Sequence, residues 1–403
     1  MFLPECADVR PRLPSVSTDE VTLDLITTRE GFDALEASWN DLFARSGRNT
    51  QLFQAFNWLW HWANHFLGTP GASGPELAIV TAHAGDRLVM VWPLVVERAG
   101  PMKVLSWMGD PVSQYGDVLM EERPDGLAIL QQAWHLVTMQ SGAAAVRLRR
   151  VREDAVVHPF LASIGAAVTA EQTAPFLDLA SAPSFAVYET RYSGSARRKR
   201  GRLRRKLAER GAVTLVSPTQ GAEAEALAAE TFRLKRHWLK TRGILAPALT
   251  DPRTAQFFAD VLRDATRPAG CYVIGLSCGD RPAATMICMH CKGRAAAHVI
   301  AYDLGFEKIS VGALLLEDSI RQATDNGTAV FDLLAPGDSY KMEWADGAMP
   351  VRDWAVARST LGRVYAMLYL GHARAALKQG FAILPADLRR RMVRLLGGKT
   401  VSS

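Results

Sequence analysis

Apolar and polar positions follow each other in two similar series along the chain. From Leu77 the sequence reads LAIVTAHAGDRLVMVWPLVV, and from Cys271 it reads CYVIGLSCGDRPAATMICMH. Each is a pair of apolar runs around a Gly-Asp dipeptide, which is typical of a β-hairpin because glycine accepts the left-handed backbone of a tight turn. The two predicted hairpins start 194 residues apart.

Further matches follow in the same order. The run 114–117 (QYGD) precedes one helical pattern, and the run 301–303 (AYD) precedes another at an offset of 186. The stretch AAVRLRRV from Ala144 then matches TAVFDLLA from Thr328, at an offset of 184. Slowly falling offsets in a constant order indicate one duplicated unit with small length differences.

The periodicities predict alternating strands and helices, and hence an α/β fold class with mixed sheets. In the first half we expect strands over 21–26, 77–83, 87–97, 102–108, 144–150 and 173–179, with helices over 31–45, 54–66, 125–140 and 153–163. In the second half we expect helices over 184–192, 195–210, 221–241, 251–266 and 311–326, with strands over 212–217, 271–277, 282–291, 294–302, 328–334 and 350–357. One or two helices, broken near Gly380 and Pro385, are expected over 361–396.

A chain of 403 residues is too long for one ordinary core. We predict an N-terminal arm over 1–19, modules over 20–182 and 183–358, and C-terminal basic helices with a tail over 359–403. Ala180 to Ser184, which contains Pro183, is the expected boundary between the modules.

The composition is 48% hydrophobic and 22% charged, as in soluble globular proteins. No apolar run reaches the roughly 18 residues of a membrane span, and the N-terminus lacks the pattern of a secretory signal. Five cysteines, an odd number, favour a reducing compartment over a disulfide framework. We therefore expect a cytoplasmic protein.

The net charge of +6 is concentrated in two segments. SARRKRGRLRRKLAER, from Ser195, carries +8 and the stretch 361–396 carries +6, which leaves −8 for the rest of the chain. A nucleic-acid surface over the whole protein is therefore not implied. Arg198 and Arg202 share one side of the first segment, which is open to three interpretations: a solvated helix, a clamp for an anionic substrate or a CoA phosphate, or a tRNA contact.

Metal signals are weak. Cys288-x-x-Cys291 has the spacing of zinc ligands, but it lies in an alternating apolar strand without a second pair, which favours core cysteines. His61 and His65 are one helical turn apart without the Glu of an HExxH motif. We predict no metal.

Two stretches of the second half carry a family resemblance: AYDLGFEKISVGALLLEDSI, from Ala301, and FDLLAPGDSYKMEW, from Phe331. A strand ending in Tyr-Asp, a turn, a helix and a strand ending in Asp resemble the GNAT acyltransferase fold. With the duplication and the basic helix, they resemble the double-GNAT, CelD-like or cellulose-biosynthesis acetyltransferases, relatives of the Fem-type aminoacyltransferases. The resemblance covers about residues 20–358. It implies two tandem GNAT-like modules, the second of which is catalytic and donor-binding.

The resemblance also implies a donor site. A GNAT module holds the pyrophosphate of acetyl-CoA or another acyl-CoA, a co-substrate, at a helix N-terminus, where free amides and the helix dipole favour an anion. Here this place is Lys308 with Ser310, Val311, Gly312 and Ala313. Only one glycine of the usual pattern is present, and a helix that uses Ser310 as N-cap explains the same residues.

The reacting groups are expected at the ends of two strands. Asp303 and Asp332 could take the proton of the acceptor nucleophile, and Tyr340 or Tyr302 could protonate the departing thiolate.

Contacts to the acceptor are expected from Lys341 and Trp344, from Tyr302, and from Arg198 and Arg202 on the basic helix. Alternatively, the loop 331–344 has a purely structural role, in which Asp332 and Lys341 form an ion pair and Trp344 serves as an apolar anchor.

The C-terminal segment alternates apolar residues such as Val364, Met367, Leu368 and Leu370 with basic ones. A basic amphipathic helix can lie on an anionic membrane at the inner face, or it can pack on its own domain.

Three functions remain open. The first is acyl-CoA-dependent N- or O-acyl transfer to a small-molecule or saccharide acceptor, in cell-envelope or exopolysaccharide metabolism. The second is Fem-like aminoacyl transfer from tRNA. The third is a catalytically inactive scaffold subunit of a polysaccharide synthase.

Overall fold

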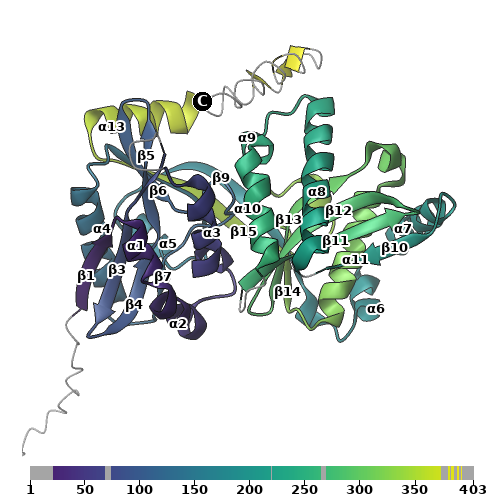
Figure 1. Cartoon of the computed structure of the whole chain (residues 1–403), viewed down its shortest axis with the longest axis horizontal. Helices are drawn as coiled ribbons and strands as arrows, with labels where there is room; N and C mark the ends of the chain where they lie inside the picture. The colour runs from purple at the N-terminus through teal and green to yellow at the C-terminus, as the bar shows by residue number, and fades with distance from the viewer. Residues whose placement is uncertain are drawn as a thin grey trace, which may run out of the picture.

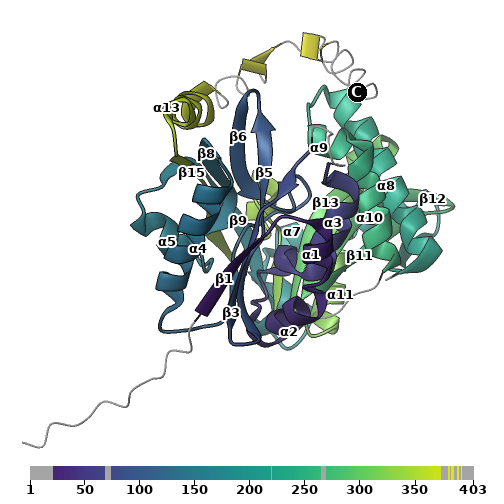
Figure 2. The same ribbon diagram turned by 60° about the vertical axis from the view of Figure 1, so that its left-hand side comes forward.

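Helices cover both faces of mixed sheets in the computed structural model (Figures 1 and 2). The structure describes residues 21–68, 74–218, 220–264 and 269–373, together with 380, 381, 383, 384, 388, 389 and 392. The predicted α/β class is confirmed. The N-terminal arm 1–19 lies outside the described residues.

The second-half sheet runs in the order β10, β11, β12, β13, β14. Its strands are β10 (Val213–Val216), β11 (Ala269–Cys278), β12 (Arg281–Cys291), β13 (Arg294–Tyr302) and β14 (Val330–Asp332). Neighbours pair antiparallel except β13 and β14, which are parallel. The predicted hairpin is β11–β12, and Gly279 in its turn has the left-handed φ of 59° that favours glycine.

Alternate residues of these strands enter two different cores. Val273 and Ile287 pack with α8 (Gly221–Arg242) and α10 (Pro252–Arg263) on one face. Ile274 and Met286 pack with α7 (Gly194–Ala208) and α11 (Val311–Asp325) on the other. A strand buried on both faces explains the nearly continuous apolar runs seen in the sequence.

The first-half strands belong to two sheets. β1 (Val21–Ile26), β3 (Ile79–Ala84), β4 (Arg87–Trp92) and β7 (Leu119–Met120) form one; β2 (Glu76–Leu77), β5 (Leu94–Ala99), β6 (Met102–Trp107) and β8 (Ala145–Arg152) join the larger sheet. β3–β4 is the second predicted hairpin, and the β6–β8 pair is parallel, as β13–β14 is. The duplication inferred from the offsets is thus visible in the strand pairing.

The two halves exchange their last strands. β9 (Ala167–Asp178) pairs with β14 of the second half, and β15 (Gly347–Ala357) pairs with β8 of the first. Because β9 and β15 also pair with each other, eleven described strands form one continuous sheet. A hydrophobic core that includes Trp58 on α3 (Phe56–Phe66) and Phe257 on α10 also joins the halves, with their rings 4.8 Å apart.

The other described helices are short or lie on the periphery. They are α1 (Arg29–Asp33), α2 (Glu36–Ser46), α4 (Gly126–Gln140), α5 (His158–Ser163), α6 (Phe185–Tyr188), α9 (Pro247–Thr250), α12 (Ser339–Met342), α13 (Thr360–Val364) and the 3-10 turns η1 (Leu52–Gln54), η2 (Leu179–Ser181), η3 (Glu189–Arg191) and η4 (Leu304–Ile309). α13 continues into the π-helical segment η5 (Tyr365–Ala373).

Several predicted bounds need correction. The expected strand 87–97 is two strands in different sheets, because Pro93 between them has no N–H for the ladder. The expected helix 153–163 begins at His158, where Pro159 occupies the first turn. The loop 331–344 contains the short helix α12, which was not predicted. Pro385 and most of the basic run 389–396 lie outside the described residues.

Candidate functional site

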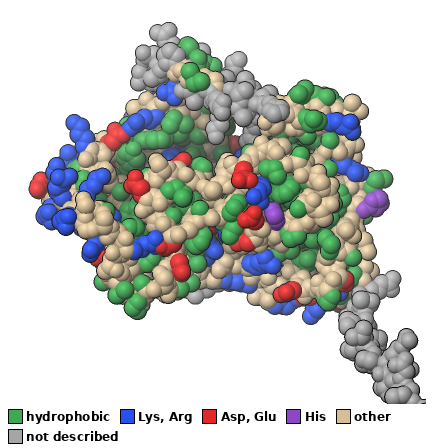
Figure 3. All heavy atoms as spheres, turned by 180° about the vertical axis from the view of Figure 1, so that it is seen from behind, with side chains coloured by type: hydrophobic (Ala, Val, Ile, Leu, Met, Phe, Trp, Pro, Cys, Tyr) green, Lys and Arg blue, Asp and Glu red, His purple; other side chains and the backbone are tan. Residues whose placement is uncertain are grey.

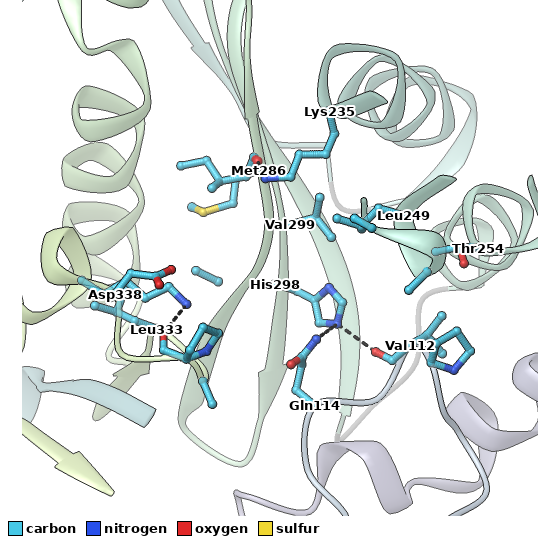
Figure 4. A pocket seen from close by; sticks show the side chains of 18 of the residues that line it. Val112, Gln114, Lys235, Leu249, Thr254, Met286, His298, Val299, Leu333 and Asp338 are labelled. Atoms are coloured by element: carbon cyan, nitrogen blue, oxygen red, sulfur yellow. Dashed lines mark hydrogen bonds between the residues drawn. The ribbon is translucent and has the colours of Figure 1, made fainter. Parts of the chain in front are cut away.

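The parallel pair β13–β14 opens into a cleft. Its pairing ends at Ala296 opposite Asp332, although β13 continues to Tyr302. The space between the diverging ends encloses about 350 Å³ and is lined by His298 and Ile300 of β13 and by the segment after β14. The first half closes one wall with Val112, Gln114 and Arg150 (Figure 4). The cleft therefore lies between the two halves.

The equivalent opening in the first half is filled. Beyond the parallel β6–β8 pair only about 20 Å³ remains. Trp107 lies against Gly116, where an added Cβ would come within 2.1 Å of the indole nitrogen. The buried carboxylate of Asp117 accepts hydrogen bonds from Gln51 Nε2 and from three backbone amides. The first half thus supplies a wall to the cleft of the second half.

His298 is the polar side chain of the cleft that sequence reasoning missed. Its Nε2 lies 2.8 Å from the carbonyl oxygen of Val112, so the hydrogen is assigned to Nε2 and Nδ1 carries the lone pair. Nδ1 is buried and has no hydrogen-bond partner among the described residues. Burial, together with the cations of Arg150 and Lys341, lowers the pKa of His298 to about 4. The ring is therefore neutral at pH 7.

Two lysines project into the same cleft. Lys235 of α8 donates to the carbonyl oxygen of Ile300 at 3.0 Å. Lys341 of α12 donates to the carbonyl oxygens of Leu334 and Pro336 at 3.0 and 3.1 Å. Burial lowers the pKa of both ammonium groups, and the carboxylate of Asp338 opposes the shift. Because the hydrogen bonds of both lysines go to neutral carbonyls, both can attract an anionic or strongly polarised group.

Tyr340 also lines the cleft. Its side chain is 45% exposed, but partial desolvation and the nearby Asp338 carboxylate together raise its pKa to about 12. The phenol therefore keeps its proton over the physiological range, as a proton donor must. The structure brings two of the predicted site residues, Tyr340 and Lys341, into one cavity.

Asp332 lies elsewhere, at the bottom of the β13–β14 pair and fully buried. Its Oδ1 accepts from Tyr115 Oη at 3.0 Å and from the amide of Leu334 at 2.8 Å, and its Oδ2 accepts from Arg294 and Arg152. Leu334 has a left-handed φ of 59°, and the Asp332 carboxylate holds its amide. This geometry favours a role in positioning the loop that carries Lys341 over a role as base. The expected ion pair between Asp332 and Lys341 is not formed.

Asp303 and Tyr302 lie outside the cleft lining. Asp303 starts the turn η4, where Oδ1 accepts from the amide of Gly305 and Oδ2 from Arg281 at 2.6 Å. The hydroxyl of Tyr302 accepts from the indole nitrogen of Trp238 at 2.9 Å. Both residues organise the end of β13.

The expected donor segment forms the start of α11. Ser310 has a left-handed φ of 55° and makes no capping hydrogen bond with its side chain, contrary to the N-cap interpretation. The amides of Val311 and Gly312 have no backbone acceptor in the described part of the chain. A Cβ at Gly312 would make ordinary contacts at 3.7 Å with Ile300 and Tyr302, and Lys308 in the preceding turn is exposed. Free amides at the start of a helix, with an exposed cation nearby in sequence, fit an anionic group such as a pyrophosphate.

Trp344 is buried and packs against Tyr192 and under the guanidinium of Arg200. This placement favours the role of apolar anchor over acceptor contact.

The basic helix α7 has two different faces. Its inner face docks on α11, where Arg200 pairs with Glu317 at 2.5 Å and Arg204 with Asp318 at 2.7 Å. Its outer face bears exposed cations that have no recorded ion pair among the described residues: Arg197, Arg198, Lys199, Arg202, Arg205 and Lys206. Figure 3 shows Lys and Arg side chains gathered at this end of the molecule. Arg198 and Arg202 therefore do not line the cleft.

No cluster of metal-ligating side chains is found within the described residues. Cys288 and Cys291 are buried in the sheet, as predicted for core cysteines. His61 and His65 contact Asp264 and Asp260 respectively.

Comparison with known proteins identifies part of the chain. Residues 194–342 match the acetyltransferase (GNAT) domain family. A search of curated protein sequences returns no significant match. The fold is similar to that of FemX, with a TM-score of 0.57 at 9% identity over 83% of this chain and 98% of that one. It is also similar to the C-terminal domain of an Agrobacterium fabrum protein assigned as a lysylphosphatidylglycerol synthetase, with a TM-score of 0.51 at 12% identity over 84% and 95% of the two chains. Residues 194–342 of the second half are thus similar to GNAT acetyltransferase domains, and the whole chain has a fold similar to that of FemX.

Proposed function

We propose that the chain is an acyl-CoA-dependent acyltransferase whose reaction takes place in the cleft between β13 and β14. The observation that carries the proposal is the opening of this parallel pair into a cavity that holds a neutral histidine, a protonated phenol and two partly desolvated lysines. The matching GNAT domain covers the second-half part of this cleft. The proposed acceptor is an amine or hydroxyl in cell-envelope or exopolysaccharide metabolism, as the CelD-like resemblance suggested.

The donor would lie with its pyrophosphate at the free amides of Val311 and Gly312, near Lys308, and would supply an activated thioester carbonyl. Lys235 and Lys341 are placed to attract negative charge that develops on the carbonyl oxygen or is carried by the acceptor.

The proton transfers would use His298 and Tyr340. As the acceptor nitrogen or oxygen bonds to the carbonyl carbon, Nδ1 of His298 takes the proton that this atom loses. As the carbon–sulfur bond breaks, Tyr340 gives its proton to the departing thiolate and later recovers one from His298 or solvent. Asp332 contributes indirectly by fixing the loop that presents Lys341.

The test is release of free CoA thiol from acetyl-CoA in the presence of amine and hydroxyl acceptors. Tyr340→Phe and His298→Gln should each lower kcat by about 100-fold, within the range for loss of a general acid or base. Tyr302→Phe is the matched control, because its hydroxyl lies outside the cleft, and it should stay within about twofold of the parent. Equal rates for Tyr340→Phe and Tyr302→Phe would refute the proposed acid.

The outer face of α7 supports a second candidate, aminoacyl transfer from tRNA, because its six exposed cations have no recorded ion pair within the described residues. A tRNA contact through this face would weaken steeply with salt, since bound phosphates release counterions. Filter binding at several salt concentrations should then show weaker tRNA binding and a shallower slope for Arg198→Glu/Arg202→Glu. An unchanged affinity and slope in this variant would exclude α7 as the contact.

A further inference from the structure

The segment that follows β15 has apolar side chains on two opposite faces. Its inner face, with Tyr365, Ala366 and Leu370, packs on β6, β8 and β15. Its outer face exposes large apolar side chains to a degree unusual for so short a stretch: Leu361 by 52%, Val364 by 49%, Met367 by 62%, Leu368 by 60% and Tyr369 by 45%. An apolar helix of this kind is normally covered on both sides.

The charged residues of this segment of the sequence are mostly cations. No Asp or Glu occurs between Leu361 and Ala386, whereas residues 374–403 hold seven Lys or Arg and one Asp. Arg358 and Arg363 are exposed at the start of the segment. An apolar stripe with cations at its start complements the surface of an anionic bilayer, where acyl chains take up the apolar side chains and headgroups attract the cations.

We infer that α13 and η5 dock the protein on anionic lipid surfaces through the outer face Leu361, Val364, Met367 and Leu368. A second copy of the chain fits this face less well, because a symmetric contact would bring two sets of cations together without carboxylates between them. The described helices include none that is long and apolar enough to cross a membrane. The contact would therefore be peripheral.

One helix that lines the cleft lies toward the same end of the molecule. In Figures 1 and 2 the helix α13 and the helix α9, whose residues Pro247 and Leu249 line the cleft, both lie at the top. Docking through α13 would thus leave this end of the molecule near the lipid surface. The inference does not depend on which group the cleft transfers.

The experiment is flotation of the full-length protein with vesicles of phosphatidylcholine alone and of phosphatidylcholine with phosphatidylglycerol. Leu361→Ser/Val364→Ser removes two half-exposed helical side chains from the proposed face. Leu127→Ser/Val187→Ser is the matched control, since these residues are 51% and 50% exposed on helices α4 and α6. We expect the parent and the control to bind the anionic vesicles, and the Leu361/Val364 variant to bind them about tenfold more weakly.

Three outcomes would overturn the inference. The first is equal vesicle binding by the parent and the Leu361→Ser/Val364→Ser variant, or no binding by the parent. The second is loss of binding only in Arg198→Glu/Arg202→Glu, which would assign the lipid contact to α7. The third is a parent dimer in sedimentation velocity that the Leu361→Ser/Val364→Ser substitution converts to monomer, which would show that a second copy covers this face.

Discussion

Replacing Asp332 by Asn distinguishes a role as general base from a role in positioning the loop that carries Lys341. The substitution preserves the shape of the side chain and an oxygen at the Oδ1 position, so the hydrogen bonds from Tyr115 and from the amide of Leu334 can remain. At the Oδ2 position it replaces an acceptor by an NH₂ donor that faces the guanidinium groups of Arg294 and Arg152. The buried Arg152 and the partly buried Arg294 then lose a negatively charged partner.

The size of the effect follows from these contacts. Breaking a buried ion pair by removing one partner costs about 3–5 kcal/mol. Arg152 keeps the carboxylate of Asp154, at 2.8 and 3.0 Å, which compensates part of the loss. We therefore expect Asp332→Asn to lower the free energy of unfolding by about 3 kcal/mol, at the low end of the range.

Urea unfolding followed by tryptophan fluorescence measures this change. Asp303→Asn is the comparison, because its partner Arg281 is exposed and the loss should stay below about 1 kcal/mol. Folded Asp332→Asn should still bind acetyl-CoA and release CoA at a rate within about tenfold of the parent. Unchanged stability together with a rate lowered by a factor of 100 or more would refute the positioning role and restore Asp332 as the base.

Further predictions concern pH, the basic helix and the cysteines. The pKa of His298 is lowered from 6.5 to about 4 in the folded chain, so the unfolded chain binds a proton first as the pH falls. The free energy of unfolding should therefore drop by about 3 kcal/mol between pH 6.5 and pH 4. In urea titrations, His298→Gln should lack this part of the decrease. Arg200→Ala should lower the free energy of unfolding by about 3 kcal/mol, and Arg202→Ala by less than about 0.5, since Arg200 is buried against Glu317; equal losses would contradict the described docking of α7. Burial raises the pKa of Cys288 to about 12 and of Cys291 to about 11, so iodoacetamide at pH 8 should modify both only after unfolding, as mass spectrometry can show.

The sequence was sufficient for the fold class and for most second-half elements. The α11 helix and the strand β13 coincide closely with their predicted ranges, because both have long, clear periodicities bounded by turn residues. The exchange of β9 and β15 could not be read from the sequence, since an apolar strand pattern does not say which neighbour the strand will pair with.

The candidate site was predicted in part. Tyr340 and Lys341 were identified because they crowd a loop directly after an apolar run. His298 was missed because one histidine within AAAHVIAY reads as part of a strand, and its cavity exists only where β13 and β14 diverge. Asp332 was predicted as a base or as the partner of Lys341, because its actual partners Arg152 and Tyr115 are about 200 residues away in sequence and are brought to it by folding.

The most direct test of the central claim is calorimetric titration of acetyl-CoA into the parent, Gly312→Asp and Gly194→Asp. A carboxylate at the start of α11 suits the helix dipole, so Gly312→Asp should fold normally but repel an anion from the free amides. Gly194→Asp adds the same charge at the start of α7, away from the cleft. We expect the parent and Gly194→Asp to bind acetyl-CoA, and Gly312→Asp to bind it at least about tenfold more weakly. Equal affinity in all three proteins, or no binding of acetyl-CoA to the parent, would contradict the central claim.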